Sequence, residues 1–112
     1  MNNLIVFCEL DEGRPADVSL ELLTRGRSLA NTLGCRLEAV VLGNGLEGIE
    51  NELFPYGVDV VHVADDPVLE HYRTMPYTSV ITSLFRQEKP QIALMGATST
   101  GRDLGPRVSS LL

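Results

Sequence analysis

The sequence predicts a three-layer α/β fold in which a parallel sheet lies between two layers of helices. Short apolar runs of strand length alternate four times along the chain with segments whose apolar residues recur at helical spacing. These runs are continuously apolar, as expected of strands that are covered on both faces. Strand–helix units of this kind, joined by right-handed crossovers, produce a three-layer domain.

The first half of the chain contains two predicted strands and the helix between them. In chain order we expect a strand at 4–8, a polar loop at 11–15, a helix at 17–33 and a strand at 37–42. Asp17 or Ser19 can cap the start of the helix, because both side chains accept hydrogen bonds from free backbone N–H groups. Gly34 stands where a left-handed C-cap is expected.

The second half repeats the pattern with shorter elements. We expect a short helix at 46–54, a strand at 58–63, a helical turn from 65–67, a helix from Pro76 to about Glu88, a strand at 92–95 and a helix after 101. Pro55 and Gly57 end the first of these helices. Asp66 and Pro67 are typical of a helix start, with an acid at the cap and proline in the first turn. The helix suggested by 108–112 stops in mid-run, so we expect a longer chain with a further strand.

The loop after the last predicted strand is the strongest candidate for a binding site. It contains six residues with this potential: Gly96, Thr98, Ser99, Thr100, Gly101 and Arg102. Glycines allow close approach of the backbone, and a helix N-terminus suits an anion such as a phosphate. The same hydroxyl groups could instead cap the helix in a tight turn. No Lys-Ser/Thr pair follows the second glycine, so the loop is not a P-loop.

The position of this loop depends on the order of strands in the sheet. Ligands of open α/β sheets bind at the carboxyl ends of the strands, near the point where strand order reverses. If the strands at 4–8 and 92–95 are neighbours, the loop shares a crevice with residues 8–11, which include Glu9 and Asp11.

Composition excludes several classes of function. Nine basic and fifteen acidic residues give a net charge of −6, which argues against binding to nucleic acid. No apolar run approaches the roughly 20 residues of a membrane span, and no signal peptide is visible, so we expect a cytoplasmic protein without membrane insertion.

No residues suggest a metal centre or a catalytic site. Cys8 and Cys35 are too few for a disulfide framework, and Cys8 is expected to be a buried thiol. His62 and His71 share no ligand spacing with each other or with a cysteine, so we assign them surface or packing roles. The sequence contains no self-contained catalytic constellation.

The stretch from Gly96 to Val108, GATSTGRDLGPRV, resembles the signature of the N-terminal domain of electron-transfer flavoprotein α-subunits. Other segments agree with this resemblance, namely 4–9, 20–23, 33–34, 41–43, 65–67 and 88–90. The resemblance covers the whole of 1–112 and implies an adenine-nucleotide α-hydrolase-like, Rossmann-like fold.

The resemblance implies an electron carrier rather than an enzyme with catalytic residues of its own. In that family the α-subunit pairs with a β-subunit of similar fold, and FAD is held mainly by a C-terminal α-subunit domain that these 112 residues do not include. A second nucleotide, AMP or FAD, lies mainly in the β-subunit. Electrons come from an acyl-CoA dehydrogenase or similar redox partner, or from NADH. We therefore expect a scaffold domain with no tightly bound cofactor of its own.

Two roles remain open for the loop under this resemblance. It could contact the nucleotide of the β-subunit through Arg102, or it could belong to an interface in which Arg102 and Asp103 form ion pairs. An alternative function is a stand-alone adenine-nucleotide-binding module similar to universal stress proteins, and a pure assembly domain is a third.

Overall fold

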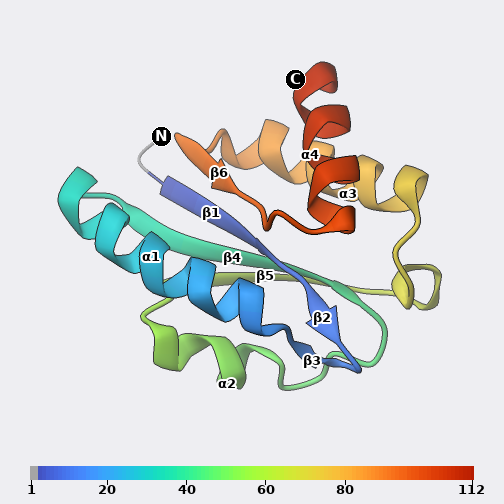
Figure 1. The fold of residues 1–112 in the computed structure, drawn as a ribbon, viewed down its shortest axis with the longest axis horizontal. Helices are drawn as coiled ribbons and strands as arrows, with labels where there is room; N and C mark the ends of the chain where they lie inside the picture. Colours follow the sequence, from blue (N-terminus) through green and yellow to red (C-terminus); the bar gives the residue numbers. More distant parts are fainter. Residues whose placement is uncertain (1–2) are drawn as a thin grey trace.

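The computed structural model describes residues 3–112 and contains one four-stranded parallel sheet (Figure 1). Its strands are β1 (Asn3–Cys8), β4 (Arg36–Gly43), β5 (Val60–Asp65) and β6 (Ile92–Leu94). They lie in the order β5-β4-β1-β6, and every neighbouring pair is parallel. The predicted parallel sheet is therefore confirmed, with the last strand beside the first.

Helices cover both faces of the sheet, as the apolar runs predicted (Figure 1). On one face lie α1 (Asp17–Leu33), α2 (Glu50–Leu53) and the short 3-10 helix η1 (Phe54–Tyr56); on the other lie α3 (Thr74–Glu88), α4 (Ser99–Leu111) and the 3-10 helix η2 (Pro67–Leu69). None of the helices in residues 3–112 is long and apolar enough to cross a membrane.

The core is divided into two clusters by the sheet itself. Along β1, Leu4 and Val6 pack in the cluster on the α1 side, while Ile5 and Phe7 pack in the cluster on the α3 and α4 side. All four side chains are at most 2% exposed. Because successive strand side chains point to opposite faces, a strand covered twice must be apolar at every position.

The start of α1 differs from the prediction. Its N-cap is Ala16, which makes no side-chain capping hydrogen bond, so neither Asp17 nor Ser19 is the cap. Ser19 is fully buried, and its hydroxyl accepts a hydrogen bond of 2.7 Å from the backbone N–H of Glu9. Tertiary pairing with the end of β1 therefore replaces local capping. Gly34 does adopt the predicted left-handed conformation, with φ of 69°.

The segment predicted as a polar loop at 11–15 is instead a small hairpin. Strands β2 (Leu10–Asp11) and β3 (Arg14–Pro15) are antiparallel. The two turn residues, Glu12 and Gly13, both have positive φ, at 51° and 78°, which is the conformation of a tight two-residue hairpin turn. The sequence pattern was too short to indicate it.

The other helices and strands begin and end within a few residues of the predicted positions. Strand β5 begins two residues later than the predicted 58–63. Asp66 caps η2 by accepting a hydrogen bond from the backbone N–H of Val68, and α3 begins at Thr74, so Pro76 lies in its first turn as expected.

Candidate functional site

The loop between β6 and α4 lies at the carboxyl end of the sheet, beside the end of β1. The pairing of β1 with β6 runs from Leu4 opposite Ile92 to Val6 opposite Leu94. Because these strands are parallel neighbours, the residues that follow them meet at the same edge. The predicted approach of residues 8–11 to the loop is therefore confirmed.

The two glycines of the loop lie against each other. Both are buried, and a Cβ atom added to Gly101 would overlap the backbone carbonyl oxygen of Gly96. Neither glycine has a positive φ. Glycine is therefore required at 101 by the close approach of two backbone segments, as in the tight turn that was one of the two interpretations of the loop.

Thr98 caps α4. Its backbone is extended, with φ of −103°, and its hydroxyl accepts a hydrogen bond of 3.0 Å from the backbone N–H of Gly101. This is the interaction that threonine makes at an N-cap. Thr98 therefore has the role that the tight-turn interpretation of the loop gave to its hydroxyl groups, which is to cap the helix.

A carboxylate of the chain itself occupies the space in front of the loop. The Thr98 hydroxyl donates a hydrogen bond of 2.7 Å to Glu9 Oε2, and a Cβ atom on Gly96 would lie 3.1 Å from the same oxygen. A negative charge beside the first turn of a helix is favourable. Glu9 thus places a negative charge beside the N-terminus of α4.

The three remaining residues of the predicted site have different environments. Ser99 and Arg102 are exposed, whereas Thr100 is half-buried and lines a hollow beside the loop. Arg102 makes no ion pair with any residue in the described part of the chain. Its guanidinium group is therefore free to contact another molecule.

Asp103 does not pair with Arg102. One of its carboxylate oxygens accepts hydrogen bonds from the hydroxyl groups of Tyr72, at 2.6 Å, and Thr74, at 2.8 Å. The other accepts one of 3.2 Å from Nε of Arg107. These bonds, led by that from Tyr72, hold the pKa of Asp103 below its usual value. Asp103 therefore ties α4 to the first residue of α3 and to the segment before it.

The hollow at the carboxyl ends of β1 and β4 has a volume of about 530 Å³. Its lining includes three carboxylates, from Glu9, Glu12 and Glu70, and no lysine or arginine. Phosphate groups would be repelled by these charges. Cys8 also lines it, and burial raises the pKa of its thiol to about 12, so that this cysteine is the buried, inert residue that was expected.

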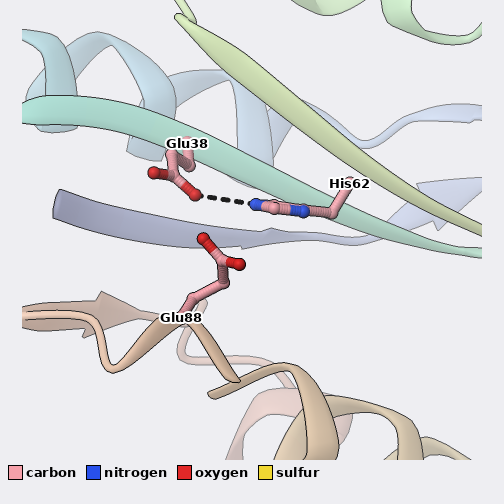
Figure 2. A group of neighbouring side chains, drawn as sticks. All are labelled: Glu38, His62 and Glu88. Carbon is pink, nitrogen blue, oxygen red and sulfur yellow. Dashed lines mark hydrogen bonds and ion pairs between the residues drawn. The ribbon is translucent and has the colours of Figure 1, made fainter. Parts of the chain in front are cut away.

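A polar cluster that the sequence did not predict lies at the opposite end of the sheet. Figure 2 shows Glu38 from β4, His62 from β5 and Glu88 from the end of α3 pointing toward one another. Nε2 of His62 lies 2.7 Å from Oε1 of Glu38. The three residues are far apart in the sequence, and the one visible signal was a lone acid inside the apolar run at 37–42. The other histidine, His71, is exposed and pairs with Glu70 at 3.3 Å.

The chain is similar to proteins of one family along almost its whole length. The family model described as "Electron transfer flavoprotein domain" matches residues 4–112. The electron transfer flavoprotein subunit alpha of Megasphaera elsdenii is 46% identical over 97% of this chain and 32% of its own length. Protein FixB of Clostridium saccharobutylicum is 50% identical over 96% of the chain and 32% of its own length. The acryloyl-CoA reductase electron transfer subunit beta of Anaerotignum propionicum is 44% identical over 96% of the chain and 29% of its own length. The chain spans about a third of each of these relatives.

Proposed function

The chain belongs to the electron transfer flavoprotein domain family, and from this premise we propose that residues 1–112 are the N-terminal α/β part of an electron transfer flavoprotein α-subunit. In this proposal the domain pairs with a β-subunit in the cytoplasm. It supports the transfer of electrons from a dehydrogenase, such as an acyl-CoA dehydrogenase, or from NADH to an acceptor. The single observation that carries the proposal is the match over 4–112.

The flavin that this function needs is FAD, which exchanges electrons with the partners when bound in the assembled protein. The residues of this chain do not fit its pyrophosphate. The Thr98 hydroxyl at the helix N-terminus already bonds to the carboxylate of Glu9, and the adjoining hollow is lined by carboxylates. We therefore assign FAD to other parts of the assembly, and this domain to its scaffold.

The same features disfavour a stand-alone nucleotide-binding module. Such a module needs free backbone N–H groups or basic side chains where its phosphates lie. Here the N–H of Gly101 bonds to the Thr98 hydroxyl, and the hollow offers no lysine or arginine. The family match does not favour the module either.

We propose that the loop from Gly96 to Arg102 is a contact surface for the β-subunit. The hydrogen bond between Thr98 and Glu9 fixes the start of the loop to the end of β1, while Arg102 at its end is exposed and without an ion pair among residues 3–112. A rigid backbone that presents one free guanidinium group suits recognition of a carboxylate or a phosphate on a partner. Arg102 would therefore bind an acidic group of the β-subunit or of its nucleotide.

The test is the substitution Arg102→Ala in the α-subunit, co-expressed with its β-subunit. We expect weaker subunit association, with a dissociation constant raised about tenfold or more by loss of one charged hydrogen bond. Arg25→Ala is the matched control, because Arg25 is an exposed arginine on α1, across the sheet. Unchanged assembly, flavin content and flavin potential in Arg102→Ala would remove this residue from the interface.

A further inference from the structure

The cluster of Glu38, His62 and Glu88 lies away from the loop and has no part in the proposed function. One potential ligand atom from each residue lies within 4.8 Å of those of the other two. The three residues come from three different elements: β4 and β5 are neighbouring strands, and α3 packs across that face of the sheet (Figures 1 and 2). The tertiary fold, and not one local turn, therefore brings them together.

The charges of this cluster are unbalanced. Glu38 is fully buried, and Glu88 is half-buried. Arg36 contacts Oε2 of Glu38 at 3.0 Å, but Glu88 makes no ion pair with any residue of the described chain. Two carboxylates held this close repel each other. Glu88 also ends a helix, where the helix dipole disfavours an acid. A cation between them would relieve both effects.

Asn3 provides an independent indication of a missing partner. Its side-chain amide donates a hydrogen bond of 3.1 Å to Oε2 of Glu38, so the side chain contacts the cluster. The amide oxygen, Oδ1, is buried and accepts no hydrogen bond from the described residues, although Asn3 is only 1% exposed. Buried polar atoms are nearly always satisfied. A metal ion, or water bound to one, would satisfy this oxygen.

We propose that Glu38, His62 and Glu88 bind one divalent transition-metal ion of the zinc class. Imidazole nitrogen with carboxylate oxygen is a donor set of zinc sites, whereas Mg²⁺ and Ca²⁺ prefer oxygen alone. Ligand atoms around a tetrahedral Zn²⁺ lie about 3.4 Å apart, from bond lengths of about 2.1 Å. The separation of 2.7 Å between Nε2 of His62 and Oε1 of Glu38 must therefore widen on binding, while the half-buried side chain of Glu88 moves toward them.

Metal binding displaces the hydrogen on Nε2 of His62. The bond of 2.7 Å between Nε2 of His62 and Oε1 of Glu38 contains a proton on the nitrogen, because the carboxylate is the acceptor. The metal ion bonds both atoms in place of that proton, which moves to Nδ1 of the ring or to solvent. Water completes the coordination.

The test uses the chain purified without a histidine tag and stripped with EDTA. It is titrated with Zn²⁺ by calorimetry and with Co²⁺ by visible absorption. We expect one ion per chain, and Co²⁺ bands of a site with one nitrogen and several oxygen ligands. His62→Gln and Glu88→Gln should each weaken Zn²⁺ binding more than about tenfold, the loss seen even for indirect partners of metal ligands. Circular dichroism checks that each variant is folded.

His71→Gln is the matched control, because His71 is an exposed histidine with a glutamate neighbour outside the cluster. This variant should bind Zn²⁺ as the wild type does. The proposal is overturned if the wild type shows no saturable binding. It is equally overturned if folded His62→Gln and Glu88→Gln keep wild-type affinity, or if binding is lost in His71→Gln.

Discussion

Replacing Gly101 by alanine tests how the loop before α4 is built. The added methyl group would overlap the carbonyl oxygen of Gly96 and lie 3.1 Å from its carbonyl carbon. Both neighbours are backbone atoms, so a change of rotamer cannot relieve the overlap. The loop must move away from α4, and the bonds that join Thr98 to Glu9 and to the Gly101 N–H must stretch.

The size of the effect follows from two opposing terms. Overpacking costs up to about 3 kcal/mol when the surroundings cannot adjust. Alanine in a helix gains about 1 kcal/mol over glycine. The free energy of unfolding should therefore fall by about 2 kcal/mol. For 112 residues the entropy of unfolding is about 0.24 kcal/mol/K, so the melting temperature should fall by about 8 °C.

Urea and thermal unfolding followed by circular dichroism measure this difference. Ser109→Ala is the control, because Ser109 is exposed on the same helix; its effect should stay within about 0.5 kcal/mol. If Gly101→Ala is as stable as the wild type, the glycine is not required for backbone packing, and the close contact between the backbones of Gly96 and Gly101 does not hold.

Three further predictions concern single side chains. Thr98→Val should lose about 1 kcal/mol of stability by removal of the helix cap, whereas Thr98→Ser should not, as urea unfolding would show. The pKa of Asp103 is lowered in the folded state from its ordinary 3.8, so its contribution to the free energy of unfolding is complete above that pH and is lost as pH falls through the folded-state pKa. When the free energy of unfolding is measured at decreasing pH, it should therefore fall less steeply for Asp103→Asn than for the wild type. Identical profiles would refute this. Under native conditions a thiol reagent should modify half-buried Cys35, while Cys8, with its pKa raised to about 12, should react only after unfolding; equal rates would contradict the burial of Cys8.

Much of the fold could be predicted because it depends on local patterns. The continuous apolar run of β1 indicated a strand covered on both faces, and Gly34 indicated the end of α1. The capping of α1 could not be predicted in the same way. Ser19 has the chemistry of a cap, but its hydroxyl bonds to Glu9 at the end of β1, and only the tertiary fold determines that choice.

The candidate site was predicted in position but not in its internal chemistry. Strand–loop–helix patterning located Gly96 to Arg102 correctly at the sheet edge. The contact of Thr98 with Glu9 joins residues 89 positions apart in sequence, so no local pattern contains it. The cluster around Glu38 was missed for the same reason, because its partners come from three separate elements.

The most direct test of the proposed function is isolation of the protein from its natural source, with measurement of its mass by light scattering and of its absorbance spectrum. The proposal predicts a complex with a β-subunit that shows the absorption bands of a flavin. A colourless chain that is alone in solution and binds adenine nucleotide by itself would contradict the proposal and favour the stand-alone module.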